Sequence, residues 1–259
     1  MDKVAEETKE TKEPITGLES FYGRDLNLED MLQLGVHFGH QKSRWNPKMK
    51  KYIYTSRQGV HIINLEQTKK SLMEACEFIK SKVANGGQVL FVGTKRQAKD
   101  IVREAAEHCQ MPYVIERWLG GTLTNFEVIR KRIGKLTILE ELKGRGELKK
   151  YTKKEQAIFG DKINKFNHKM GGIKKMRALP AVIFAVDSVH DKLAISEAKI
   201  MGIPVVSLMD TNGDPETVDY PIPANDDAVG SLKFILAYIS DCVLNGGDSQ
   251  NKSDNVKKQ

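Results

Sequence analysis

The residues best suited to chemistry are the cations of a short aromatic-rich run, residues 41–58, QKSRWNPKMKKYIYTSRQ. This run holds six Lys and Arg side chains and no acidic one, with Trp45, Tyr52 and Tyr54 between them. Cationic side chains neutralise phosphates, and an aromatic or guanidinium plane stacks on an exposed base. Anchoring the core is the alternative role of the aromatics. We expect RNA contact from Lys42, Arg44, Trp45, Lys48, Lys50, Lys51 and Arg57.

A second cationic run spans residues 128–177, with 16 basic and 5 acidic side chains and a net charge of +11. The whole chain carries only +7, because residues 1–30 and 178–259 have net charges of −5 and −6. Such clustering is typical of a polyanion site, although a charged helical hairpin can also be merely solvated. The expected RNA contacts in this run are Arg130, Lys131, Lys149, Lys150, Lys153, Lys154, Lys174 and Lys175.

Two shorter motifs offer further cations. Lys95 and Arg96 lie in VGTKRQAK, residues 92–99, where an apolar run gives way to a helical pattern, and a helix start binds phosphate well. The motifs GxxxxGK[ST] and GxGxxG are both absent, so an RNA phosphate is a better candidate ligand here than a nucleotide. Arg117 lies in RWLGGTLTN, residues 117–125, directly before the second cationic run. We expect these three cations to contact RNA as well.

A metal or catalytic site has weaker support. His37 and His40 are three residues apart and could share a helical face. Near the C-terminal strands lie Asp210, Asp214, Asp219, Asp226 and Asp227. These residue types can bind Zn²⁺ if the fold brings them together, but capping, turn and core roles explain them as well. No GxSxG or HExxH motif occurs, so we expect no enzymatic activity, no cofactor, no resident metal and no small-molecule substrate.

The elements that must position these residues alternate along the chain. Apolar, β-branched runs predict strands at residues 61–65, 88–93, 113–115, 181–187 and 203–210. Helical patterns predict helices at residues 66–84, 94–109, 193–201 and 225–244, with Thr94 and Asn225 as caps. Buried strands that alternate with helices indicate an α/β fold on a parallel sheet, which we assign to residues 24–125 and 178–245.

Residues 126–177 interrupt this alternation. Apolar residues recur from Phe126 to Leu136 at spacings of three, four and three, and from Phe159 to Ile173 at four, three, four and three. Between the two patterns lie a glycine-containing break and a capping box that begins at Thr152. The pattern predicts an inserted antiparallel coiled-coil hairpin with cations on its flanks.

The ends and the cysteines set further limits. Residues 1–23 and 246–259 are polar, so we expect a disordered extension and a flexible tail. The N-terminus lacks the apolar segment of a secretion signal, and no apolar run is long enough to span a membrane. Cys76, Cys109 and Cys242 show no CxxC spacing, so we expect neither a disulfide framework nor a zinc–thiolate site, and a reducing cytoplasm fits.

Several long blocks are similar to one known family. They are GVHFGHQKSRWNPKMKKYIYTSRQGVHIINLEQT, QVLFVGTKRQA, RWLGGTLTN, KMGGIKKM, PAVIFAVDSVHDKLAISEAKIMGIPVV and DTNGDPETVDYPIPANDDA, in this order within residues 24–245. On these blocks the chain resembles the bacterial small-subunit ribosomal protein two family. The resemblance implies a Rossmann-like α/β domain with a protruding coiled-coil hairpin. It also implies a structural role in the cytoplasmic small ribosomal subunit, between its head and body.

The same resemblance implies partners. They are small-subunit ribosomal RNA and neighbouring ribosomal proteins, including ribosomal protein one, the large mRNA-binding protein. The acidic region 178–259 is unsuited to RNA, so we expect Asp226 and Asp227 to face a basic patch of a protein partner. A nucleotide- or phosphosugar-dependent enzyme on the same scaffold and a free-standing RNA chaperone are the alternatives.

Overall fold

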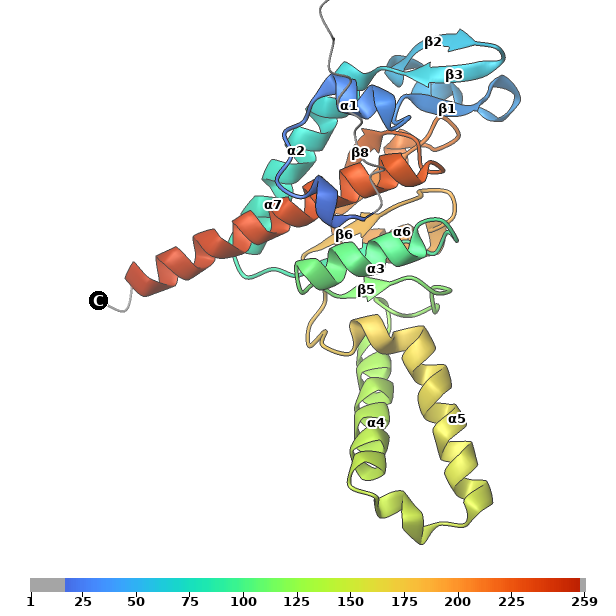
Figure 1. Ribbon diagram of the computed structural model, residues 1–259, viewed down its shortest axis with the longest axis vertical. Coiled ribbons are helices and arrows are strands. Elements are labelled where there is room, and N and C mark those ends of the chain that lie inside the picture. Colours follow the sequence, from blue (N-terminus) through green and yellow to red (C-terminus); the bar gives the residue numbers. More distant parts are fainter. Residues whose placement is uncertain (1–16, 257–259) are drawn as a thin grey trace, which may run out of the picture.

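The computed structural model describes residues 17–256, apart from the side chains of residues 149 and 248–256. Most of the expected N-terminal extension, residues 1–16, and the last three residues of the expected tail lie outside the described residues. Figure 1 shows three parts along the long axis of the molecule: a small β-sheet at one end, an α/β body, and a helical hairpin at the other end.

A five-stranded parallel sheet forms the centre of the body, in the order β5-β4-β6-β7-β8. Its strands are β4 (Val89–Val92), β5 (Tyr113–Val114), β6 (Val182–Ala185), β7 (Val205–Met209) and β8 (Tyr220–Pro223). Every residue of β4, β6 and β7 is buried, so the predicted α/β fold on a parallel sheet is confirmed. β8 is not among the predicted strands, because its two prolines argue against a strand; the edge of the sheet tolerates them.

Helices cover both faces of this sheet. α1 (Leu28–Gln33), α2 (Leu65–Ala84), α3 (Lys99–His108) and α7 (Val229–Val256) enclose one core, which contains Phe91 and Phe184. α6 (Lys192–Ile200) and the root of the hairpin enclose a second core, which contains Leu90 and Ile183. Leu90 and Phe91 belong to different cores because neighbouring residues of a strand point to opposite faces. None of the helices in the described part of the chain is long and apolar enough to cross a membrane.

The strand expected at residues 61–65 lies outside the parallel sheet. It is β3 (Val60–Ile63), which pairs antiparallel with β1 (Phe38–Gln41) and β2 (Ile53–Arg57) in a separate three-stranded sheet. The turn between β2 and β3 contains Gln58 and Gly59, whose φ angles of 51° and 80° fit a tight β-hairpin. Two 3-10 turns, η2 (Lys42–Arg44) and η3 (Pro47–Tyr52), connect β1 to β2. The first cationic run therefore lies on this small sheet and its connection.

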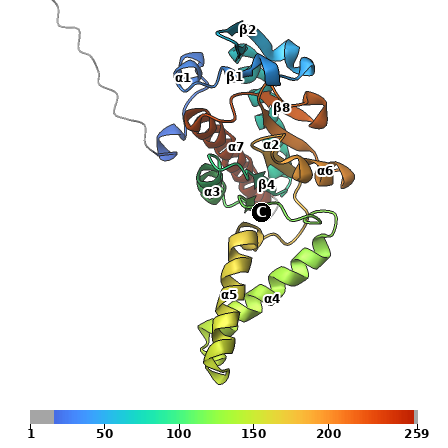
Figure 2. The same cartoon turned by 90° about the vertical axis from the view of Figure 1, so that its right-hand side faces the viewer.

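The predicted helical hairpin is formed by α4 (Phe126–Gly144) and α5 (Lys153–Met170), which are joined through the turn η4 (Glu147–Lys150). Thr152 and Glu155 form the predicted capping box at the start of α5. The buried residues of the predicted seam are Ile129, Ile133, Leu136, Ile163, Met170 and Ile173, the last of which lies in the turn η5 (Gly171–Ile173). Both legs leave the body at neighbouring points, and the hairpin projects away from it (Figures 1 and 2).

Parts of both ends that were expected to be disordered have defined structure. Leu18 and Phe21 are buried, and Phe21 packs edge-on against Phe234 of α7, with ring centroids 6.4 Å apart. At the other end, α7 continues past the expected stop at residue 244 to Val256. Gly246 packs closely on α2, because a Cβ atom there would lie 3.0 Å from the carbonyl oxygen of Lys80.

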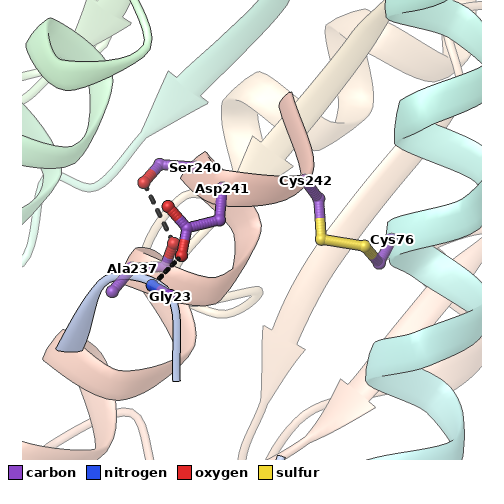
Figure 3. Close-up of a disulfide and its surroundings, with 6 residues drawn as sticks. All are labelled: Gly23, Cys76, Ala237, Ser240, Asp241 and Cys242. Carbon is purple, nitrogen blue, oxygen red and sulfur yellow. Dashed lines mark hydrogen bonds between the residues drawn. A yellow bond between two sulfur atoms is a disulfide. The ribbon is translucent and has the colours of Figure 1, made fainter. Parts of the chain in front are cut away.

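A disulfide joins Cys76 of α2 to Cys242 of α7, which corrects the expectation that no disulfide forms (Figure 3). The two Cα atoms are 5.7 Å apart, although 166 residues separate them in the sequence. α2 packs along α7, and this packing brings the two cysteines together. No cysteine spacing motif in the sequence predicts the pair. Cys109 remains a buried thiol, and burial raises its pKa to about 12.

Candidate RNA interface

The first cationic run forms an exposed surface at the small-sheet end of the molecule. We call it the loop surface; it consists of Lys42, Arg44, Lys50, Lys51 and Arg57. No described carboxylate lies within ion-pair distance of any of these five, so their charges are available to phosphates. Lys48 is different, because its ammonium lies 2.8 Å from Asp214 and also contacts Glu216. Lys48 therefore ties η3 to the body; its side chain is still 45% exposed, so its contact with RNA stays a prediction.

The aromatic residues of this run divide between packing and exposure. Trp45 packs against His61, with ring centroids 5.0 Å apart, so it is first an anchor of the small sheet. Tyr54 is 76% exposed. A β-bulge leaves Tyr54 without a cross-strand partner between the paired residues Ile53 and Thr55, and a bulge of this kind re-aims a side chain.

The hairpin presents a second set of exposed cations. We call it the hairpin surface; it consists of Arg130, Lys131, Lys150, Lys153, Lys154 and Lys175. Among the described residues only Lys150 has a carboxylate nearby, and its exposed pair with Glu147, at 3.8 Å, is worth little. The side chain of Lys149 lies outside the described part of the chain.

Lys174 contacts a residue of the other leg of the hairpin rather than projecting freely from its surface. Its ammonium contacts both carboxylate oxygens of Glu140, at 2.7 and 2.8 Å, and the Asn167 amide donates to the same carboxylate at 2.6 Å. The hydrogen bond from Lys174 lowers the pKa of Glu140. This contact fastens α4 to the segment after α5, so Lys174 positions the hairpin and is not a free RNA contact.

Lys95 is not available to RNA, because three carboxylates surround it. Its ammonium lies 2.8 Å from Asp226, 2.7 Å from Asp227 and 3.5 Å from Asp187. Burial alone would lower the pKa of Lys95, but the hydrogen bonds to Asp226 and Asp227 outweigh it and raise the pKa. Arg96, the next residue, is exposed. Of the two cations in this motif, Lys95 is therefore internal and only Arg96 lies at the surface.

The same pairing changes the role expected of Asp226. Its side chain is only 2% exposed, so a partner protein has no access to it. Burial, together with the nearby charges of Asp187 and Asp210, raises the pKa of Asp226. Asp227 keeps half of its side chain exposed. Of the two residues predicted to contact a protein partner, only Asp227 lies at the surface.

His40 completes a cluster of donor atoms with Asp210, Asp226 and Asp227, all within 4.8 Å of one another. Its Nδ1 atom lies 2.9 Å from the Asp210 carboxylate, and this hydrogen bond raises the pKa of His40. His37 is not part of the cluster: its ring packs on Phe38, and burial lowers its pKa. Lys95 supplies positive charge to this cluster through its contacts with Asp226 and Asp227, which offsets the repulsion between their carboxylates.

Asp191 lies at the same end of the parallel strands. Thr94, expected to cap a helix, instead donates its hydroxyl to Asp191 at 2.6 Å, and α3 begins only at Lys99. The second carboxylate oxygen of Asp191 is buried without a hydrogen-bond partner among the described residues. Burial, reinforced by the charge of Asp187, raises the pKa of Asp191 to about 6.

A buried glutamate that sequence patterns do not single out fixes the loop before the hairpin. Glu197 of α6 accepts hydrogen bonds from the Trp118 indole at 3.0 Å and from the N–H groups of Gly121 and Leu123 at 2.8 and 2.9 Å. Burial opposes ionisation of Glu197, but these hydrogen bonds outweigh it and lower its pKa. Trp118 is thus structural, whereas Arg117 beside it is exposed. In the sequence Glu197 looks like any acid of an amphipathic helix.

Comparison of the chain with known proteins shows which family it belongs to. Residues 31–246 match the model of the family described as ribosomal protein S2. The chain is 49% identical over 218 residues to the small ribosomal subunit protein uS2 of Dehalococcoides mccartyi, covering 84% of this chain and 89% of that protein. It is 48% identical over 225 residues to the protein of the same name from Synechocystis, covering 87% and 84%. The chain therefore belongs to the ribosomal protein S2 family.

Proposed function

We propose that this chain binds small-subunit ribosomal RNA through the loop surface and the hairpin surface, and that these contacts hold two segments of the RNA in a fixed arrangement. Membership of the family makes the chain a structural protein of the small ribosomal subunit in the cytoplasm, and not an enzyme. The proposal concerns how it contacts the subunit.

The observation that carries this proposal is the pairing state of the lysines and arginines. Lys95 and Lys174 are held by carboxylates within the fold, and Lys48 bridges Asp214 and Glu216. The loop surface and the hairpin surface have almost no such partners, so their cations keep their full charge for an external polyanion. The small sheet and the helical hairpin, which carry these two surfaces, lie at opposite ends of the molecule, which suits contact with two separate RNA segments (Figure 1).

The binding mechanism we infer is electrostatic. Each cation that contacts a phosphate releases condensed counterions, so affinity falls as salt rises. Folded RNA is recognised mainly by its shape and backbone, so these side chains fix position more than they read sequence. The Glu140–Lys174 contact holds the two legs of the hairpin together and the Glu197 hydrogen bonds fix the loop before it, so both are in place before RNA arrives, which lowers the entropy cost of binding.

The hairpin surface is tested by reconstitution of the small subunit. We expect replacement of Lys150, Lys153 and Lys154 by Gln to reduce incorporation of the full chain by at least about tenfold in competition with wild type, through the loss of three phosphate contacts. A matched control replaces three exposed lysines of the body, Lys70, Lys192 and Lys199, by Gln. Equal incorporation of both variants would show that the hairpin lysines are only a solvated face.

The half-exposed Asp227 supports a second contact, with ribosomal protein one. We infer that this carboxylate, at the acidic end of the parallel strands, meets a basic patch on that partner. Asp227→Asn is expected to weaken retention of ribosomal protein one on purified subunits without affecting incorporation of the chain itself. Retention equal to that of wild type would exclude this site.

A further inference from the structure

A groove of about 560 Å³ lies at the root of the hairpin, between the start of α4 and the segment that follows η5. Its walls are the loop residues 123–125, the first turn of α4 up to Arg130, the segment 177–179 that follows η5, and Met201 at the end of α6. Segments far apart in the sequence thus form one concave site, and it does not overlap the cluster around Lys95 and Asp226.

Two arginines from opposite legs of the hairpin line this groove. Arg130 comes from α4 and Arg177 from the chain that returns to the body after α5. Both are exposed, and neither has a described carboxylate within ion-pair distance, although Glu127 also lines the groove. A guanidinium stays charged at any physiological pH and matches the oxygens of a phosphate with two parallel N–H groups.

The remaining walls suit the other parts of a nucleotide. Leu179 and Met201 are 37% and 38% exposed, and they add apolar surface to the groove. Asn125 stands before the start of α4, but its side chain makes no capping hydrogen bond and stays available. The groove therefore combines cationic, polar and apolar surface, as the phosphate, sugar and base of an RNA chain require.

We propose that this groove binds a stretch of ribosomal RNA backbone, with Arg130 and Arg177 holding its phosphates from two sides. The proposal rests on the RNA-binding function proposed above and deepens it, because it locates one contact and assigns Arg177 to it. Arg130 belongs to both the groove and the hairpin surface, and the exposed Lys131 and Lys175 lie one and two residues from the two arginines in the sequence, so the groove is continuous with the hairpin surface. This continuity favours RNA over an acidic protein segment as the occupant.

The groove is preformed by contacts that do not involve the arginines. Glu197 holds the N–H groups of Leu123 and Thr124 at 2.9 and 3.3 Å, which fixes one wall. Lys174 binds Glu140 at 2.7 Å, which fixes the two legs relative to each other. Replacing either arginine therefore leaves the groove walls intact, and its effect reports on the occupant rather than on folding.

The test measures affinity of the full chain for transcribed small-subunit RNA at several salt concentrations. We expect Arg130→Gln and Arg177→Gln each to weaken binding about tenfold. Each should also reduce the slope of log affinity against log salt concentration by about the amount that one phosphate contact contributes. The double variant is expected to lose less than the product of the two single losses, since both arginines hold the same stretch of backbone. The control is Arg103→Gln, an exposed arginine of α3, which should bind as wild type does.

Three results would overturn the proposal. If the double variant binds RNA like wild type while the Lys150, Lys153 and Lys154 variant is weakened, the groove is not an RNA site although the proposed function stands. If the wild-type chain does not bind this RNA, both the groove proposal and the proposed function are wrong. If the double variant keeps its RNA affinity but a neighbouring protein is lost from reconstituted subunits, the occupant is a protein segment.

Discussion

At the scale of single residues, lysines and arginines fall into two groups. Some are paired with carboxylates inside the fold, and others are exposed without such a partner among the described residues. Lys95 and Arg96 are neighbours in one motif, yet Lys95 is held by three carboxylates and Arg96 is exposed. The carboxylate of Asp226 lies 131 residues away in the sequence. Local patterns cannot reveal such a partner, so the sequence predicts where cations cluster but not which of them stay free.

The internal role of Lys95 predicts a stability effect. Lys95→Met leaves the buried carboxylate of Asp226 without its partner, and breaking a buried pair in this way costs about 3–5 kcal/mol. Arg96→Gln, one residue away, should change the free energy of unfolding by less than about 0.5 kcal/mol. Urea unfolding measures both. A Lys95→Met protein as stable as Arg96→Gln would contradict the assignment.

Asp191 predicts a dependence of stability on pH. Burial raises its pKa to about 6 in the folded protein from an ordinary value of 3.8, so the folded form binds more protons between these values. Stability should therefore fall as pH rises from about 4 to about 6, by about 2–3 kcal/mol from this group, and stay level above.

Asp191→Asn removes this loss, because an amide oxygen can still accept from Thr94 and no buried charge forms. We expect the variant to be more stable than wild type at pH 7 and its unfolding midpoint to fall less from pH 4 to pH 6. Asp100→Asn, at an exposed position of α3, is the control. A variant less stable than wild type at pH 7 would show that the Asp191 charge is stabilising.

At the scale of elements, long and strongly patterned segments are predictable and short polar ones are not. The hairpin follows from its heptad spacing and from the capping box at Thr152 and Glu155, and the buried strands follow from continuous apolar runs. β1 has only four residues, and β2 carries polar residues and a bulge, so neither has a clear period. Sheet membership of β3 was predicted wrongly, since an apolar run of this length does not reveal whether its partners are parallel.

The Cys76–Cys242 disulfide links two elements and predicts a redox-dependent stability. Closing a loop of this length restricts the unfolded chain and stabilises the folded state by about 2–5 kcal/mol. Dithiothreitol should therefore lower the urea midpoint of the oxidised protein. Cys242→Ala should be insensitive to dithiothreitol, whereas Cys109→Ala, which removes the buried free thiol, should respond like wild type. The same midpoint with and without reductant would mean that the bond does not form.

At the scale of the whole molecule, the net charge of +7 is a poor summary. The loop surface belongs to the small sheet and the hairpin surface to the helical hairpin, two parts that lie at opposite ends of the molecule (Figure 1), whereas the carboxylates of the acidic cluster follow β7 and β8 of the body. Sequence blocks reveal the uneven charge, but only the fold separates the two cationic surfaces in space. A chain of this shape is suited to hold two RNA segments apart at a fixed distance.

The most direct measurement is the affinity of the full chain for small-subunit ribosomal RNA as a function of salt. If the loop and hairpin surfaces bind phosphates, affinity should fall by about 1,000-fold or more between 0.05 and 0.2 M salt, as six or more phosphate contacts require. Replacing Lys150, Lys153 and Lys154 by Gln should make that fall shallower. An affinity that changes by less than about twofold over this range would contradict RNA binding through these two surfaces.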